Sequence, residues 1–185
     1  MKRFKIESKE GPGYRKATIG TLPRSIDQVT QGLIANALDA KATKIDITVD
    51  DTITIEDNGL GMTPDKEFIS FWRMGDHEDH EDASGTSGQF NIEAKSIANI
   101  CEELDFRSVR GGKAIVAHQI FSEDTELTKD VPYINVEPEP DEKGTTLVLK
   151  GLKNYGASLE ALPEKLRDKY LWTFLPRLDT VNLTV

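Results

Sequence analysis

The feature that most constrains this chain is a strand pattern that ends in an acid and runs directly into closely spaced glycines. Residues 52–57 read TITIED, and a strand's period of two places Ile53, Ile55 and Asp57 on one face. The next letters, NGLGM, carry two glycines, which let another group approach the backbone closely. The pattern therefore predicts a carboxylate at the end of an apolar strand face, beside an open stretch of backbone.

Such a carboxylate can accept a hydrogen bond from an exocyclic amine, for example that of adenine. Ile55 and Met62 would then supply an apolar wall for a flat ring, and small-ligand pockets usually combine apolar lining with a few polar groups. A plain type I′ or II turn explains the same letters, because Asn-Gly is a common turn dipeptide. The segment alone leaves both interpretations open.

The chain has 185 residues, which suits one globular domain. Residues 1–24 form a mixed N-terminal segment with glycine and proline breakers, and residues 25–185 are predicted to be a single domain. Ser25 and Gln28 fit a capping box, after which apolar residues recur at helical spacing over residues 26–41.

The rest of the pattern alternates irregularly between helices and strands. We expect an α+β fold, a two-layer α/β sandwich with a mixed, mostly antiparallel sheet and helices on one face. The first two strands lie around Ile47 and Ile55, joined by a tight turn. Further strands are expected at residues 104–110, 113–121, 133–139, 145–152 and 180–185, and helices from Pro64, from Ile92 and over residues 158–175.

Composition excludes several classes of protein. No apolar run approaches the roughly 20 residues of a membrane helix, and the first residues lack the apolar core of a signal peptide, so we expect no membrane partner and a cytoplasmic location. A net charge of −9 argues against broad binding to a nucleic-acid backbone. The single cysteine, Cys101, falls in an apolar helical pattern and is expected to be a buried structural thiol.

Three more blocks accompany the opening segment. NALDA, residues 36–40, lies on the first helix, and GTTL begins a strand at Gly144. Between them SGTSGQFNIEAKS, residues 84–96, runs from a loop into a helix, where backbone amides favour an anion. These blocks, in this order, resemble the GHKL superfamily of ATP-binding domains over about residues 25–150. That superfamily includes gyrase-type topoisomerase subunits, ninety-kilodalton heat-shock chaperones, MutL and MORC proteins, and sensor histidine kinases.

The resemblance implies an ATP or ADP site with Mg²⁺. Asp57 would accept the adenine amino group, with Thr145 supporting that contact directly or through water. Asn36 would coordinate the Mg²⁺ that bridges the phosphates. The remaining residues that the resemblance places against the nucleotide or in the lid over its phosphates are Ala40, Gly59, Gly61, Met62, Gly85, Gly88, Gln89, Phe90 and Lys95.

The chain departs from the superfamily at the position of the general base. Hydrolysing members usually carry a glutamate four residues before the asparagine, and here that position is Gly32. Loss of a general base typically costs about 10²–10⁴ in rate. The lid also departs, because Asn91 and Glu93 occupy positions where the superfamily often has glycine.

Four functions follow from this pattern. The first is a Mg²⁺-dependent ATPase domain with weak or partner-dependent hydrolysis, part of a longer chain or of a nucleotide-dependent dimer. The second is a non-hydrolysing nucleotide sensor. The third is a histidine kinase catalytic domain, and the fourth is a structural domain with accidental motifs. A chaperone-like role falls within the first class. The acidic loop at residues 76–82, DHEDHED, is expected to be solvated, with a divalent metal site as the alternative.

Overall fold

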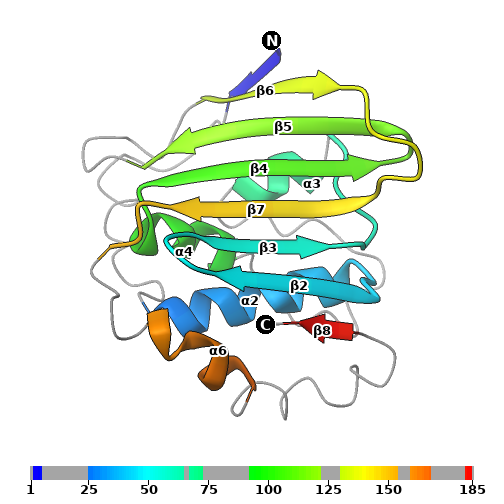
Figure 1. Cartoon of the computed structure of the whole chain (residues 1–185). Coiled ribbons are helices and arrows are strands. Elements are labelled where there is room, and N and C mark those ends of the chain that lie inside the picture. The colour runs from blue at the N-terminus through cyan, green and yellow to red at the C-terminus, as the bar shows by residue number, and fades with distance from the viewer. Residues whose placement is uncertain are drawn as a thin grey trace.

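A single β-sheet forms one layer of the molecule, and the helices pack on one of its faces (Figure 1). The computed structural model describes residues 2–5, 25–64, 67–72, 92–121, 130–153, 159–167 and 182–184. The strands are β1 (Lys2–Lys5), β2 (Lys44–Val49), β3 (Ile53–Asp57), β4 (Glu103–Arg110), β5 (Lys113–Ile120), β6 (Asp130–Val136), β7 (Gly144–Lys150) and β8 (Asn182–Thr184). The helices are α2 (Ile26–Asp39), α3 (Glu67–Trp72), α4 (Ile92–Ile100) and α6 (Leu162–Lys165).

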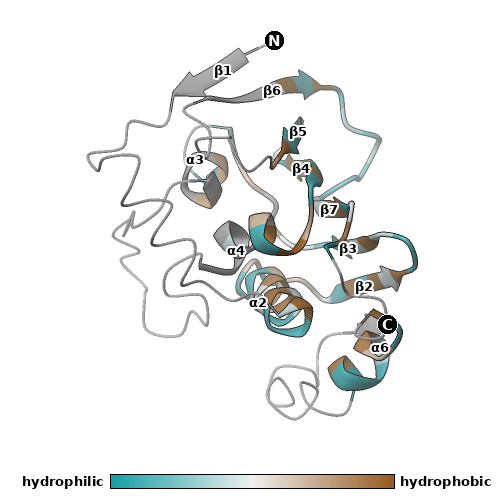
Figure 2. Ribbon diagram, turned by 90° about the vertical axis from the view of Figure 1, so that its left-hand side faces the viewer, coloured by the Kyte–Doolittle hydropathy of each residue, from teal (hydrophilic) through white to brown (hydrophobic). Residues whose placement is uncertain are grey.

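The eight strands lie in the order β1-β6-β5-β4-β7-β3-β2-β8. Neighbouring strands are antiparallel except for β2 and β8, which run parallel. Figure 2 views the sheet close to its edge, with α2, α3 and α4 on one side. The expected α+β sandwich, with a mixed and mostly antiparallel sheet and helices on one face, is therefore confirmed.

Helix α2 begins and ends at recognisable caps. The Ser25 hydroxyl accepts a hydrogen bond from the Gln28 amide, 3.4 Å away, as the capping pattern predicts. At the other end Lys41 takes a left-handed φ of +60°, so the helix stops at Asp39 rather than at residue 41. The Ala42 amide then reaches back to the Ala37 carbonyl at 3.0 Å, the hydrogen bond that closes a Schellman motif.

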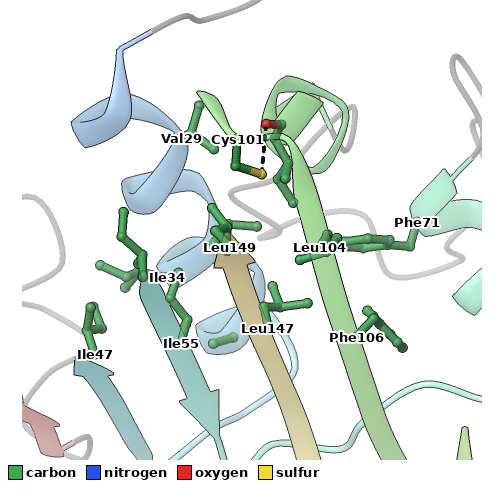
Figure 3. Packing of buried hydrophobic residues seen from close by; sticks show 14 of the residues in the cluster. Val29, Ile34, Ile47, Ile55, Phe71, Cys101, Leu104, Phe106, Leu147 and Leu149 are labelled. Carbon is green, nitrogen blue, oxygen red and sulfur yellow. Dashed lines mark hydrogen bonds between the residues drawn. The ribbon is translucent and has the colours of Figure 1, made fainter. Parts of the chain in front are cut away.

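The core lies between the sheet and the helices, where inward-facing strand residues meet the apolar faces of α2, α3 and α4 (Figure 3). Phe68 of α3 packs on Phe106 of β4 with ring centroids 5.1 Å apart. Cys101 is fully buried, and burial raises the pKa of its thiol to about 12, which confirms the structural thiol. Because side chains alternate between the two faces of each strand, the sheet has one apolar face, and the helices pack against it.

Element boundaries differ modestly from the sequence expectations. Strand β6 begins at Asp130 and ends at Val136, about three residues earlier than expected. Of the helix expected over residues 158–175, residues 159–167 are described and contain α6, whereas residues 158 and 168–175 lie outside the described residues. The N-terminal segment supplies β1, which pairs with β6 and was not anticipated. No helix in the described ranges is both long enough and apolar enough to cross a membrane.

Candidate functional site

Asp57 ends β3 on its inward face, beneath the same helices that cover Ile53 and Ile55. It lies between Ile45 of β2 and Thr145 of β7 and is only 9% exposed. Its Oδ1 accepts a hydrogen bond from the Gly59 amide at 2.7 Å. The sequence prediction of a carboxylate at the end of an apolar strand face is therefore confirmed.

Burial raises the pKa of Asp57 to about 6, since a carboxylate loses solvation in an apolar setting. Hydrogen bonds from the amides of Gly59 and Thr145 oppose that rise by stabilising the charged form. The ionised form, which can only accept hydrogen bonds, therefore prevails only above about pH 6.

Asn58, the next residue, braces the sheet and is not part of a hairpin turn. Its Oδ1 accepts from the amides of Thr43 and Lys44 at 2.8 and 2.9 Å, and its Nδ2 donates to the Thr43 hydroxyl at 2.9 Å. The neighbours of β3 are β2 and β7, so the Asn-Gly pair does not connect β3 to a following paired strand. The segment therefore does not form the turn of a β-hairpin.

The loop after Asp57 lies directly on neighbouring backbone. Gly61 has a φ of +67°, and a Cβ there would stand 2.1 Å from the Val109 carbonyl oxygen of β4. Gly144, at the start of β7, has a φ of +100°, and a Cβ there would stand 1.8 Å from the Asp57 carbonyl oxygen. Only glycine fits at these two positions, because both the dihedral and the space exclude a side chain.

Helix α2 is joined to this loop at its C-terminal end. The Ala40 carbonyl accepts a hydrogen bond from the Leu60 amide at 2.8 Å, which sets Gly59 against Ala40. Asn36 lies one turn earlier on the same helix and is half-buried. Its side chain has no hydrogen-bond partner within the described part of the chain.

Thr145 and Ser108 lie next to Asp57 on the inward face of the sheet. The two residues are paired across β7 and β4, and their hydroxyl oxygens are 2.9 Å apart. Ser108 also accepts a hydrogen bond from the Met62 amide at 2.8 Å, and the Met62 side chain remains half-buried against the core. Sequence reasoning missed Ser108. The sequence does contain a signal for it: Ser108 falls on the same strand face as Leu104 and Phe106, where an apolar residue is expected.

Several of the sequence-predicted residues meet at this corner. The backbone and hydrogen bonds described above bring Ala40, Asp57, Gly59, Gly61, Met62 and Thr145 together. The lid residues Gly85, Gly88, Gln89 and Phe90 and the acidic loop 76–82 lie outside the described residues. The backbone of Lys95 belongs to α4, but its side chain is not described.

The described residues contain no group of three or more His, Cys, Asp or Glu side chains placed to hold a metal ion. Asn36 nevertheless offers an amide oxygen that no described residue engages. Mg²⁺ prefers oxygen ligands and commonly takes only one or two from the protein, with the rest from phosphates and water. The donor set at Asn36 therefore fits a Mg²⁺ that arrives with a phosphate ligand.

The fold and the match to a family model identify a class of ATPase domains. Residues 24–149 match the family described as histidine kinase-, DNA gyrase B-, and HSP90-like ATPase, and the chain belongs to that family. The match spans most of the chain, from the cap of α2 to the end of β7, and confirms the GHKL resemblance.

Two curated proteins are similar in sequence. The DNA mismatch repair protein MutL of Staphylococcus carnosus is 28% identical over 145 residues, which cover 74% of this chain and 21% of that protein. The putative type II restriction enzyme HgiDII of Herpetosiphon aurantiacus is 31% identical over 138 residues, which cover 66% of this chain and 22% of that protein. The chain thus spans about a fifth of the length of these relatives.

Proposed function

We propose that this domain binds ATP and ADP together with Mg²⁺, and that it hydrolyses ATP weakly or only with a partner. The observation that carries the proposal is the buried Asp57 carboxyl at the end of β3, beside the Gly59 backbone and the Thr145 hydroxyl. The amides of Gly59 and Thr145 leave acceptor capacity on this carboxylate, and the 6-amino group of adenine is a donor that would use it. Family membership favours the same ligand.

In this proposal Asn36 binds the metal, and its place on α2 puts that metal at the phosphate end of the site. When bound, Mg²⁺ would neutralise phosphate charge. Asp57 would orient the base, Thr145 would support it, and Met62 would cover one face of the ring. The positions of Gly88, Gln89, Phe90 and Lys95 at the phosphates stay a prediction from the family pattern.

Titration with ATP, ADP and GTP, each with and without Mg²⁺, tests this proposal. Asp57→Asn should weaken ATP binding by at least about tenfold, because the amide turns a donor toward the adenine amine and loses the charge. The far-ultraviolet circular dichroism of the variant should match that of the wild type. Equal affinity of the two proteins for ATP would refute the role of Asp57. Asn36→Ala should bind ATP with little dependence on Mg²⁺.

A non-hydrolysing sensor is the second candidate, and Gly32 is the observation that favours it. Gly32 is buried on α2 one turn before Asn36, at the position where hydrolysing members usually carry the general base. Phosphate release measured for the wild type and for Gly32→Glu separates the two functions. A weak ATPase should release phosphate as the wild type, and Gly32→Glu should release it at least about 10²-fold faster if only the base is missing. A sensor should release none as the wild type, and release by Gly32→Glu alone would show that the missing base accounts for its inactivity.

The length of the relatives suggests that other domains or a second copy act together with this one. We propose that nucleotide occupancy controls that association. Light scattering of the chain with ADP, and with a non-hydrolysable ATP analogue, tests this idea directly. The same mass with both nucleotides would rule out nucleotide-dependent dimerisation of this chain.

A further inference from the structure

Ser108 is the most completely engaged hydroxyl at the candidate site. The residue is fully buried in the middle of β4, and its Oγ contacts three other groups. The Met62 amide donates to it at 2.8 Å, the Gly144 carbonyl lies at 3.2 Å, and the Thr145 hydroxyl lies at 2.9 Å. One side chain thus joins the loop after β3 to the start of β7.

The direction of these hydrogen bonds follows from counting hydrogens. A serine hydroxyl has one hydrogen and two acceptor lone pairs. The Met62 amide occupies one lone pair, and the Gly144 carbonyl, which can only accept, takes the hydrogen. Either hydroxyl can be the donor of the 2.9 Å contact, and once the Ser108 hydrogen points to Gly144, the Thr145 hydroxyl is the one that donates to the remaining lone pair. In this arrangement every hydrogen-bonding capacity of the buried Ser108 is used, as buried polar groups normally require.

We propose that Ser108 is a positioning residue for base specificity: it takes the Thr145 hydrogen, so that Thr145 Oγ1 faces the site as an acceptor beside the Asp57 carboxylate. Asp57 and Thr145 are directly paired across β3 and β7 on the inward face. Two adjacent acceptors favour a purine with an amino group at C6, which offers two hydrogens. They repel a 6-oxo purine, whose oxygen offers only lone pairs. The inference rests on the proposed nucleotide site.

A purely structural role for Ser108 makes a different prediction. If the hydroxyl only holds the loop through the Met62 amide, its loss should weaken all nucleotides by the same factor. If it also orients Thr145, its loss frees the Thr145 hydrogen to turn toward the site and donate to a 6-oxo group. The preference for ATP over ITP, its 6-oxo counterpart, should then fall.

The test is the ratio of ITP to ATP dissociation constants, measured by calorimetry with Mg²⁺. Ser108→Ala should lower this ratio by about tenfold, the effect of one hydrogen bond changed from repulsive to attractive. Ser108→Cys, with a weaker donor and acceptor, should give an intermediate ratio. Thr30→Val is the matched control, because among the described residues the buried Thr30 hydroxyl donates only to the Ile26 carbonyl of its own helix, 2.8 Å away. It should lower stability and leave the ratio unchanged.

A double-mutant cycle shows whether Ser108 acts through Thr145. In a Thr145→Val background, Ser108→Ala should leave the ratio unchanged, because the group that it orients is absent. Equal weakening of ATP and ITP by Ser108→Ala would overturn the inference and leave the proposed function intact. If Ser108→Ala does not fold, a wild-type ratio in Ser108→Cys would overturn it instead. A wild-type protein that binds neither nucleotide would overturn the proposed function as well.

Discussion

Two opposing effects act on the Asp57 carboxyl, and they determine when it is charged. Burial favours the protonated form, while the amides of Gly59 and Thr145 favour the ionised form. Burial prevails, and the pKa rises to about 6. In the unfolded chain an aspartate titrates near 3.9. The folded state therefore holds this proton more tightly than the unfolded state does.

The pH dependence of stability should report this difference. Because the folded pKa is the higher one, the contribution of Asp57 is fully present below about pH 4 and is lost as pH rises through 6. The free energy of unfolding of the wild type, measured relative to Asp57→Asn by urea titration, should fall by about 2 kcal/mol between pH 4 and pH 7. A constant difference between the two proteins over that range would contradict the raised pKa.

At the same scale, the sequence predicts some of these residues and misses others for physical reasons. Asp57 was predictable because strand periodicity places it on the face of Ile53 and Ile55. The bracing role of Asn58 was not, since its partners Thr43 and Lys44 lie at the start of β2, 15 and 14 residues away in the chain. Ser108 could not be assigned, because its role depends on strands that only tertiary structure brings together.

At the scale of elements, close backbone contacts place the loop after β3 and the start of β7. Gly144 lies against the Asp57 carbonyl, and Gly61 lies against the Val109 carbonyl. The turn between β4 and β5 contains another left-handed glycine, Gly111, where a Cβ would meet nothing within 4 Å. Gly144 and Gly111 therefore both have a positive φ, but only Gly111 has room for a Cβ atom.

Alanine substitutions at Gly111 and Gly144 distinguish the cost of a left-handed backbone from the cost of a steric clash. Gly111→Ala should cost about 1–2 kcal/mol of unfolding free energy, the price of a left-handed backbone. Gly144→Ala should cost at least about 2 kcal/mol more, because two backbone segments must also separate. Chemical denaturation of both variants gives the comparison. Equal losses would show that the β7 backbone can move away from Asp57 without cost.

Elements with clear periodicity were predicted well, and those without it were not. Strands β2, β3, β4 and β5 alternate strictly enough that their bounds agree closely with expectation. Strand β1 was missed because it lies in a short segment followed by breakers, and its pairing with β6 is long-range. The exact end of α2 was missed because the left-handed residue that stops it is Lys41 rather than glycine.

At the scale of the whole molecule, the candidate site depends on pairings between distant parts of the chain. Asp57 on β3 pairs with Thr145 on β7, and Ser108 on β4 pairs with the same residue. These three strands are adjacent in the middle of the sheet. A ligand that contacts Asp57 and Thr145 should therefore stabilise the sheet as a whole.

Thermal unfolding should show that global effect. With ATP and Mg²⁺ at about one hundred times the dissociation constant, the free energy of unfolding should rise by about 2.7 kcal/mol, and the midpoint should rise with it. Asp57→Asn at the same ligand concentration should show a much smaller shift. A wild-type midpoint that ATP does not move would argue against nucleotide binding by the native fold.

The hydrogen bond from Leu60 to the Ala40 carbonyl has a consequence for the size of any ligand. It couples the last turn of α2, which carries Asn36, to the loop that follows Asp57. The separation between the Asn36 amide and the Asp57 carboxylate, the groups proposed to bind the metal and the base, is then fixed by the protein before a ligand binds. A compound long enough to contact both groups should therefore bind more tightly, because the protein does not have to be ordered on binding. Free adenine or free phosphate can contact only one of the two groups.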